Sequence, residues 1–350
     1  MAPSTIKQWT VEGQNGFESL KLNEKAPLPE LGDRDVLVKF HAASLNFRDL
    51  IIPKGQYPFP VKDNIIPGSD GAGTVEAVGS RVTRFKTGDK VVTLFSQGHL
   101  AGSLDHASLG TGLGGVVDGT LREYGSFDEQ GLVHAPSNLS FGESATLSCA
   151  ALTAWNALYG LETRAIKPGQ TVLTQGTGGV SIFAVQFAKA AGARVIATTS
   201  SADKAEVLKK YGADHVINYK ETPNWGEQAK SLTPGGRGVE HVVEVGGPTT
   251  MAQSLKAVAI DGVISIIGFI GGFSKDQPTF LDCLNNICTV RGLLVGSRLQ
   301  LEDMIRAIEQ NDIHPVVDSK TFTLTELKDA YQYMWDQKHF GKLVIKIGEQ

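Results

Sequence analysis

The sequence predicts an α/β protein in which a β-rich domain is followed by a domain built on a doubly wound parallel sheet. Three observations support this prediction. The length of 350 residues fits about two domains of ordinary size. Short segments rich in β-branched residues lie between Gly, Pro and Asp over roughly the first 135 residues. Beyond Thr171, strand-like and helix-like segments alternate, as they do in the crossover units of a parallel sheet.

Four segments of the β-rich part are expected to be strands. They are DVLVKFHAA (35–43), GTVEAVG (73–79), DKVVTL (89–94) and the segment around LREYGSF (121–127). Residues 97–119 are polar and rich in Gly, and they predict a loop. From 142 to 162 the apolar residues recur at helical spacing, and Pro168-Gly169 follows that segment. A second domain therefore begins in this region.

The second domain is expected to contain about six parallel strands, the number found in the doubly wound dinucleotide-binding fold. The strand-like segments are 171–175, 193–199, 215–219, 239–245, 263–268 and 289–295, with helical stretches such as 181–191 and 204–212 between them. A further helix is expected at 301–311. The final strand-like segment, KLVIKI (342–347), is expected to return to the first domain, because another parallel strand would need its own crossover and chain termini are often close together.

Charge and composition narrow the classes of partner. Lys and Arg number 33 against 37 Asp and Glu, and no basic run is present, so we expect neither nucleic acid nor a membrane as partner, but a small-molecule substrate. The three cysteines (Cys149, Cys283 and Cys288) are too few and too irregular for a disulfide framework, which favours a reducing, cytoplasmic location. The N-terminus does not resemble a signal peptide, and the longest apolar stretch, 262–273, is too short and too rich in Gly to span a bilayer.

A glycine-rich turn between a strand and a helix predicts a phosphate-binding site. It lies directly after the strand-like TVLTQ and directly before an apolar helical segment. Glycines there permit a tight turn and let backbone N–H groups approach a pyrophosphate at the helix N-terminus. The alternative is a glycine turn that binds no ligand. The predicted cofactor-binding residues are Gly176, Thr177, Gly178, Gly179 and Val180, with Ser181 where Gly or Ala is usual.

The end of the next strand favours NADPH over NADH. An Asp or Glu about 20 residues beyond the glycine turn would bind the ribose hydroxyls of NAD. Here Thr199 and Ser200 stand at that place, followed by Lys204, and no acid precedes Asp203. Hydroxyl donors and a positive charge suit a 2′-phosphate, which a carboxylate would repel. Lys204 alone also fits an ordinary solvated helix face.

The sequence resembles the medium-chain dehydrogenase/reductase superfamily across its whole length, and its zinc-independent quinone oxidoreductase-like branch most. The resemblance is carried by SLNFRDLIIPKGQYPFP, IIPGSDGAGTVEAVG, GDKVV, LSCAALTAWNAL, TVLTQGTGGVSIFAVQFAKAAGARVIATTSS, KYGADHVINY and HFGKLVIKI. It implies a GroES-like catalytic domain over 1–136 and 297–350 and a Rossmann domain over 137–296, with the active site in the cleft between them.

The same resemblance implies that no metal is bound. Zinc-dependent relatives have Cys-His where this chain has Asn46-Phe47, and Gly-His-Glu where it has Gly68-Ser69-Asp70. Cys149 matches a third ligand in some relatives, but it also fits a buried small apolar residue at the start of a helix. An amide and a hydroxyl are poor substitutes for thiolate and imidazole in a zinc site.

Without a metal, hydrogen-bond donors have to stabilise charge that develops on the acceptor. The resemblance points to Asn46, Arg48 and Tyr57 as the catalytic residues, since an amide, a guanidinium and a phenol are all donors. Each has a structural alternative. Asn46 also fits a turn or cap after a strand, Tyr57 fits the core or a surface wall, and Arg48 fits an ion pair with Asp49 or Asp70.

Further cofactor contacts follow from the resemblance, residue by residue. Thr153 faces the nicotinamide in relatives, and Tyr219, at the end of the third strand, is placed to stack near adenine or approach the 2′-phosphate. Lys342 lies in a segment that closes over the cofactor in relatives, although it also fits an ordinary strand lysine. The remaining predicted contacts are Gly246, Gly268, Phe269, Ile270, Leu294 and Val295.

The sequence thus predicts a zinc-independent, NADPH-dependent oxidoreductase that transfers hydride to a quinone, an enone or another activated double bond. An NADP(H)-dependent alcohol dehydrogenase or carbonyl reductase, or a protein that binds NADPH without catalysis, are the alternatives. Pairing through the strand near Thr289 would give a homodimer, as is common in the family.

Overall fold

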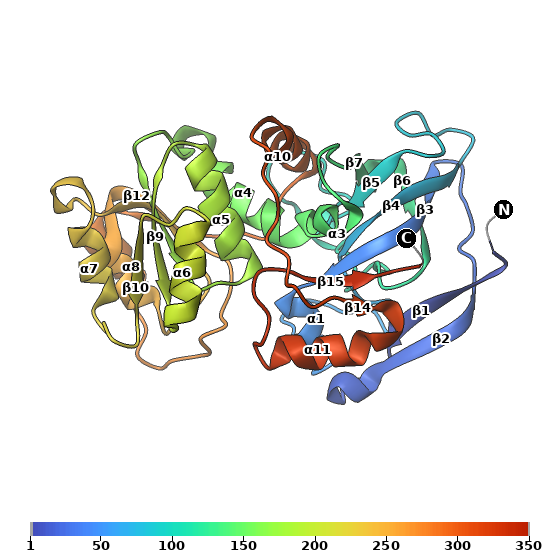
Figure 1. Ribbon diagram of the computed structural model, residues 1–350, viewed down its shortest axis with the longest axis horizontal. Helices are drawn as coiled ribbons and strands as arrows, with labels where there is room; N and C mark the ends of the chain where they lie inside the picture. Colours follow the sequence, from blue (N-terminus) through green and yellow to red (C-terminus); the bar gives the residue numbers. More distant parts are fainter. Residues whose placement is uncertain (1–2, 349–350) are drawn as a thin grey trace. The chain divides into compact units, whose positions relative to one another are not determined.

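The computed structural model describes residues 3–348, and its internal contacts divide the chain into two compact units (Figure 1). Unit 1 runs as far as Leu152 and resumes at Gly296, and unit 2 comprises Thr153–Val295. The predicted fold class is confirmed, since one unit is rich in antiparallel strands and the other contains a parallel sheet covered by helices.

Unit 1 is built on a seven-stranded sheet. The strand order is β14-β15-β3-β4-β5-β7, and β6 also pairs with β3. The bounds are β3 Asp35–Leu45, β4 Asp70–Val78, β5 Lys90–Thr93, β6 Tyr124–Asp128, β7 Leu132–His134, β14 Phe322–Thr323 and β15 Leu343–Lys346, with a separate antiparallel ribbon of β1 Thr5–Val11 and β2 Leu20–Pro27. Leu343 pairs with Leu45 across β15 and β3, so the last strand does return to the first part of the chain.

The helices of unit 1 are mostly short. They are α1 Phe47–Ile51, α2 His106–Leu109, α3 Phe141–Ser144, α10 Arg298–Gln310 and α11 Leu327–Trp335, with the π-helical turn η3 Leu147–Ala151 and the 3₁₀ turns η1 Gly16–Ser19, η2 Glu129–Gly131 and η6 Leu324–Glu326. The predicted loop 97–119 contains α2, whose first turn is capped because the Asp105 carboxylate accepts from Ser108 N at 2.7 Å.

Residues 137–152 differ from the sequence-based division of the chain, which assigned them to the second domain. In the structure they belong to unit 1. There α3 packs on β3 and β4, and η3 packs on β4 and β5. The helical spacing of apolar residues across 142–162 is real, but the first half of that segment buries its apolar face against the sheet of unit 1.

Unit 2 contains six parallel strands in the order β10-β9-β8-β11-β12-β13. The strands are β8 Thr171–Gln175, β9 Arg194–Thr199, β10 His215–Asn218, β11 Val239–Glu244, β12 Val258–Ile266 and β13 Thr289–Gly292. The helices are α4 Leu152–Tyr159, α5 Gly179–Ala190, α6 Ala202–Lys210, α7 Trp225–Ser231, α8 Met251–Ala257 and α9 Leu281–Asn286, with 3₁₀ turns η4 Glu162–Arg164 and η5 Pro234–Gly236. Numbered within the unit, this is the doubly wound order 3-2-1-4-5-6.

This strand order creates a switch point between β8 and β11, where the chain changes direction across the sheet. Helix α5 packs on β8 and β9, and α8 packs on β11 and β12. Ligands of such sheets bind beyond the carboxyl ends of the strands at this point. The glycine-rich turn follows β8, so the fold places it at the switch point.

Each unit has its own apolar core. Phe40, Leu45 and Tyr331 are among the residues that fill the core of unit 1, and Leu173, Ile196 and Ile264 belong to that of unit 2. Among the helices of residues 3–348, none has the length and apolar character needed to cross a membrane.

Candidate active site

Asn46 sits where β3 gives way to α1. It occupies the N-cap of that short helix, and its backbone N–H donates to Asp49 Oδ2 at 2.8 Å, so the predicted capping alternative describes its backbone correctly. The Asn46 side chain instead faces Lys342 and Ser69. Only 8% of the residue is exposed. The backbone therefore serves the helix while the amide remains available for another role.

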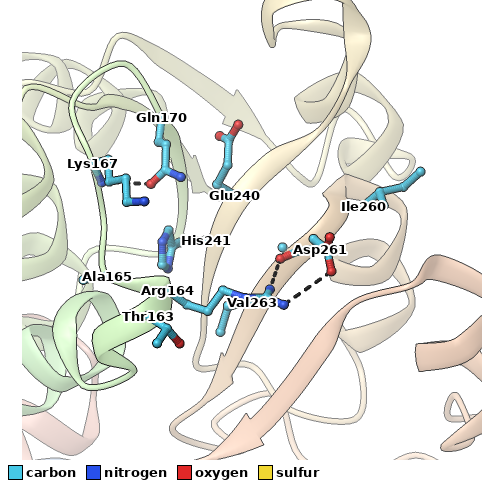
Figure 2. A pocket seen from close by; sticks show the side chains of 11 residues that line it. Thr163, Arg164, Ala165, Lys167, Gln170, Glu240, His241, Ile260, Asp261 and Val263 are labelled. Carbon is cyan, nitrogen blue, oxygen red and sulfur yellow. Dashed lines mark hydrogen bonds and ion pairs between the residues drawn. The ribbon is translucent and has the colours of Figure 1, made fainter.

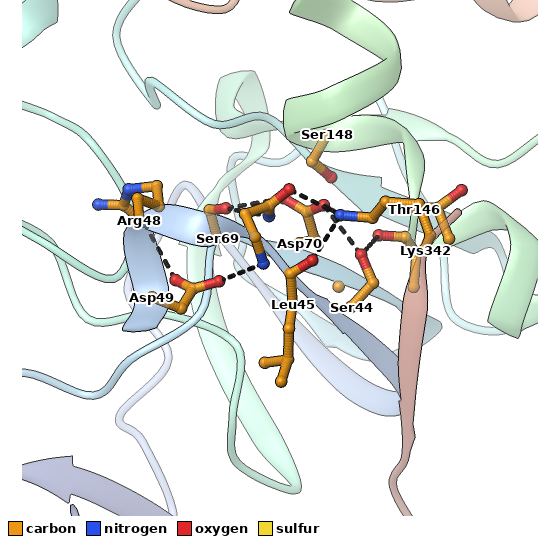
Figure 3. Close-up of polar contacts among 12 residues, drawn as sticks. Ser44, Leu45, Arg48, Asp49, Ser69, Asp70, Thr146, Ser148 and Lys342 are labelled. Atoms are coloured by element: carbon orange, nitrogen blue, oxygen red, sulfur yellow. Dashed lines mark hydrogen bonds and ion pairs between the residues drawn. The ribbon is translucent and has the colours of Figure 1, made fainter. Parts of the chain in front are cut away.

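Lys342, just before β15, is the centre of a buried polar cluster in unit 1 (Figure 3). Its ammonium donates to Leu45 O at 2.8 Å, to Asn46 Oδ1 at 2.6 Å and to Asp70 Oδ2 at 3.3 Å. An ammonium carries three N–H donors. All three have acceptors inside unit 1, so the cofactor contact predicted for Lys342 finds no remaining donor in this arrangement.

Asp70 supplies the negative charge of this cluster. The carboxylate is fully buried and pairs with the Lys342 ammonium. The hydroxyls of Ser44 and Ser69 also donate to it, at 2.9 and 2.7 Å. Ser69 Oγ in turn accepts from Asn46 Nδ2 at 3.4 Å. Asn46, Ser69, Asp70 and Lys342 thus form a closed ring of hydrogen bonds around one buried ion pair.

Arg48 and Tyr57 are in direct contact. Arg48 Nε donates to the Tyr57 hydroxyl at 3.3 Å, and the guanidinium lies over the Tyr57 ring, 5.0 Å from its centroid. Arg48 Nη1 also donates to Leu113 O at 2.8 Å and lies 3.6 Å from Asp49 Oδ1. Of the two ion pairs considered for Arg48, the structure shows the one with Asp49. Asp49 also accepts from Asn46, so all three predicted catalytic residues belong to one cluster.

Cys149 lies in the η3 turn beside this cluster. Its side chain is partly exposed, yet burial of the sulfur and the nearby Asp70 carboxylate raise the pKa of the thiol to about 12. The thiol is therefore protonated at neutral pH. Within residues 3–348, no three His, Cys, Asp or Glu side chains are grouped so as to hold a metal ion.

The glycine-rich turn of unit 2 has the backbone needed for close approach of an anion. Gly176 has a φ of +74°, which L-residues rarely adopt. Gly178 is the N-cap residue of α5, and because it has no side chain it leaves the first N–H groups of the helix uncapped. A Cβ added at Gly178 would meet nothing within 4 Å. The N-terminal N–H groups of α5 are thus open to a ligand. Ser181, which replaces the usual Gly or Ala, donates its hydroxyl to Gln175 O at 2.6 Å and fits the helix–strand packing.

A buried Gln–Glu pair clamps the two strands on either side of the switch point. Gln175 Nε2 donates to Glu244 Oε2 at 2.7 Å, and Gln175 Oε1 accepts from Gly246 N at 3.1 Å. Glu244 Oε1 accepts from the backbone of Gly246 and Gly247, both at 2.9 Å. Sequence reasoning missed this pair. A polar residue that ends each of two otherwise apolar strands was the available signal.

The residues predicted to recognise the 2′-phosphate lie together at the ends of β9 and β10. Thr199 O accepts from Tyr219 N at 3.0 Å, which joins the two strand ends. Ser201 caps α6 by accepting from Lys204 N at 3.5 Å. Lys204 is half-buried in the first turn of that helix, and Tyr219 is 41% exposed. The structure therefore brings these four residues together at the carboxyl ends of β9 and β10, namely Thr199, Ser200, Lys204 and Tyr219.

The remaining predicted cofactor contacts fall into two groups. Gly246 O accepts from Gly271 N at 3.0 Å, so the turn that contains Gly268, Phe269 and Ile270 lies against the end of β11. Val295 has a φ of +51°, an uncommon conformation for a β-branched residue. Asn156 Nδ2 holds it by donating to Val295 O at 2.7 Å. Asn156 belongs to α4, as does buried Thr153, so Thr153, Leu294 and Val295 come from connected segments.

Unit 2 also contains a cavity of about 310 Å³ that is separate from the glycine-rich turn (Figure 2). Gln170, Glu240 and His241 line it near the amino ends of β8 and β11, whereas the turn follows the carboxyl end of β8. Burial, with Arg291 and Arg164 nearby, lowers the pKa of His241 to about 4, so the imidazole is neutral at pH 7. This cavity is not part of the candidate site.

Comparison with known proteins identifies the family. The family model described as alcohol dehydrogenase GroES-like domain matches residues 32–137, and the model described as zinc-binding dehydrogenase matches residues 179–310. The zinc-type alcohol dehydrogenase-like protein C1773.06c of Schizosaccharomyces pombe is 49% identical over 336 residues, which is 95% of this chain and 96% of that protein. The chain belongs to the medium-chain dehydrogenase/reductase superfamily, and it is an oxidoreductase of that family.

Relatives that are named for different activities match almost the full length of the chain. A chloroplastic quinone-oxidoreductase QR1 of Triphysaria versicolor is 31% identical and covers 99% of this chain and 100% of that protein. The crystal structure of an NAD-dependent alcohol dehydrogenase superposes with a TM-score of 0.87 at 32% identity, over 98% of this chain and 100% of that one. Family membership implies a nicotinamide cofactor but does not choose between NAD and NADP.

The stability of the protein should depend on the protonation of Asp49. Burial raises the pKa of Asp49 to about 6 against the pull of Arg48 and of the Asn46 N–H. Between about pH 4 and 6 the folded protein therefore keeps a proton that the unfolded chain has lost, so this stabilising contribution disappears as the pH rises. We therefore compare wild type with D49N, which cannot titrate at this position. The difference between their free energies of unfolding, wild type minus variant, should fall by up to about 3 kcal/mol from pH 4 to 7.

Urea unfolding between pH 4 and 8 measures this difference. The same substitution at exposed Asp63 serves as the control for the loss of a surface carboxylate. A wild-type-minus-D49N difference that stays constant over this pH range would contradict the expectation.

Proposed function

We propose that this protein is a zinc-independent, NADPH-dependent reductase that transfers hydride to a conjugated acceptor such as a quinone, an enone or another activated double bond. The observation that carries the proposal is the buried cluster of unit 1. It offers N–H and O–H donors from Asn46, Arg48 and Tyr57, with an ammonium at its centre, and it lacks the thiolate and imidazole ligands that zinc prefers.

The glycine-rich turn fits a dinucleotide. Gly176, Gly178 and the N-terminus of α5 would hold the pyrophosphate, since the backbone there is open and carries the positive end of the helix dipole. When bound, the nicotinamide supplies the hydride. The Gln175–Glu244 pair joins the ends of β8 and β11, and so holds the strand end from which the glycine-rich turn begins.

The edge formed by β9 and β10 supports NADPH over NADH. Thr199 and Ser200 provide hydroxyl donors, and Lys204 provides a cation in the first turn of α6. The acid of this turn, Asp203, is exposed. A 2′-phosphate needs such donors, whereas the ribose diol of NADH is usually held by a carboxylate at the strand end.

On the acceptor side, this chain's residues supply hydrogen bonds and positive charge. Asn46 Nδ2, the Tyr57 hydroxyl and the Arg48 guanidinium would donate to the acceptor oxygen, on which negative charge develops during reduction. Conjugation spreads that charge over several atoms, so donors of this strength suffice. An isolated carbonyl concentrates the charge on one oxygen and needs stronger polarisation. Relatives named as alcohol dehydrogenases make carbonyl reduction the second candidate.

A panel of acceptors tests the proposed function. Purified protein of known metal content is mixed with NADPH or NADH and with ortho- and para-quinones, enones, and unconjugated ketones and aldehydes. We expect turnover of conjugated acceptors by zinc-free protein, with a kcat/KM at least about tenfold higher for NADPH than for NADH. Turnover restricted to isolated carbonyls, or dependent on stoichiometric zinc, would contradict the proposal. Tight NADPH binding without turnover would indicate a non-catalytic protein.

Replacement of Gly178 by Ala tests the cofactor cradle. The position is open and outside the positive-φ region, so the fold itself does not require glycine there. An added methyl group should instead obstruct a pyrophosphate. We expect G178A to weaken NADPH binding about tenfold or more by fluorescence titration with little change in melting temperature. Gly142 in unit 1, where an added Cβ would make only ordinary contacts of 3.7 and 3.9 Å, gives the control G142A. Unchanged NADPH affinity in G178A would argue against this cradle.

We further propose that the protein is a homodimer joined through β13. This strand is the edge of the sheet of unit 2, and an unpaired edge favours pairing with a second copy. Large apolar side chains are exposed just before it, namely Phe280 (84%), Leu284 (72%) and Ile287 (56%).

Light scattering coupled to size exclusion tests this dimer. We expect the mass of a dimer for wild type and a shift toward the monomer for L284E, because a buried carboxylate would oppose association. The substitution L299E, at another exposed leucine, is the control. A monomeric wild type at micromolar concentration would contradict the proposal.

A further inference from the structure

We propose that Lys342 is a positioning residue for Asn46: its ammonium fixes the side-chain amide in one orientation and so makes Asn46 a permanent hydrogen-bond donor at the acceptor site. This inference rests on the proposed function, in which Asn46 Nδ2 contacts the acceptor.

The chemistry of the ammonium determines which atom of the amide it contacts. Lys342 Nζ can only donate, and it lies 2.6 Å from the Asn46 side chain. The contacted atom must therefore be the oxygen. The oxygen and nitrogen ends of an asparagine amide are alike in shape, and the hydrogen-bond partners decide which end lies where. Here the exchange would place NH2 against NH3⁺, two groups that have no lone pair to share.

The rest of the ring holds Lys342 in place. Its other two donors bind Leu45 O at 2.8 Å and Asp70 Oδ2 at 3.3 Å, and only 3% of the residue is exposed. The Asp70 carboxylate compensates the buried positive charge, and Ser44 adds a hydrogen bond to the same carboxylate oxygen. The Lys342 ammonium therefore keeps these three acceptors, and its hydrogen bond to Asn46 Oδ1 persists.

The opposite end of Asn46 is only partly satisfied. Asn46 Nδ2 donates to Ser69 Oγ at 3.4 Å, a long contact, while Ser69 commits its own hydrogen to Asp70 Oδ1 at 2.7 Å. An amide NH2 carries two N–H groups. Among residues 3–348 the structure gives this NH2 the single acceptor Ser69, so one N–H remains for a bound acceptor oxygen. Lys342 therefore acts through Asn46 rather than by touching the acceptor.

A mutant cycle on the reduction reaction tests this coupling. Removing Lys342 alone would leave Asp70 as an uncompensated buried charge and endanger folding. The pair is therefore replaced together as K342M/D70N, which keeps the site neutral. We expect N46A to lower kcat about a hundredfold, as loss of one oxyanion donor does, and K342M/D70N to lower it about tenfold or more. The dissociation constant for NADPH should stay within about twofold in both.

The decisive measurement is the triple variant K342M/D70N/N46A. If Lys342 works through Asn46, the triple variant should have a kcat within about threefold of N46A alone, because the orientation has no amide left to act on. If the two losses multiply, Lys342 does not position Asn46 and the proposal is overturned. The variant S148A removes another buried hydroxyl nearby, one that bonds Thr93 and not the ring, and it controls for general disturbance of this region.

A second readout needs no turnover, so it separates failure of this inference from failure of the proposed function. In protein labelled with ¹⁵N-asparagine, N46A identifies the side-chain signals of Asn46. We expect these signals to move and their exchange with water to quicken in K342M/D70N, but not in S148A. Unchanged Asn46 signals in K342M/D70N would overturn the inference even if no acceptor in the panel were reduced. If wild type reduced no acceptor but the Asn46 signals still moved in K342M/D70N, the proposed function would be wrong and the inference about Lys342 would stand.

Discussion

The contact of the Lys342 ammonium with Leu45, Asn46 and Asp70 is the interaction on which unit 1 depends most. It joins residues almost 300 positions apart in the chain and ties the last strand to β3 and β4. The register of β15 on β3 makes it possible, since Leu343 pairs with Leu45. A slip of one residue would turn Lys342 to the other face of the sheet and leave the buried Asp70 carboxylate without its cation.

Unit 2 also joins strands that are distant in sequence, but it does so through hydrogen bonds and not through an ion pair. The switch point needs two neighbouring strands to end in open turns, and open turns leave backbone N–H groups unsatisfied. Gln175 and Glu244 accept from those of Gly246 and Gly247 inside the sheet. The N–H groups at the start of α5 remain open because no side chain caps it. Each unit therefore satisfies the polar atoms that must be rigid and leaves open those that a ligand can use.

Much of this was predictable from local sequence, because the signals were local. A glycine-rich turn between an apolar strand and an apolar helix needs no knowledge of distant residues, and neither do the six strands of unit 2. Strand limits were less predictable. β12 begins at Val258, five residues before the predicted start, because Val258 pairs with Val239 ahead of an irregularity in the ladder. The Lys342 ring and the Gln175–Glu244 clamp were missed, because both form only when strands distant in sequence are paired.

An acceptor oxygen can be polarised by a metal ion or by hydrogen-bond donors, and the ring around Lys342 belongs to the second kind. A zinc ion accepts a lone pair from the acceptor oxygen directly. An ammonium with its three donors already engaged does not do this, and its charge reaches the acceptor only through the amide that it orients. Such indirect polarisation is weaker, and it suits acceptors that spread charge by conjugation. Arg48, held over Tyr57 and against Leu113, adds a second fixed cation to the same unit. The moderate strength of these donors is the reason why we propose conjugated acceptors as the substrates.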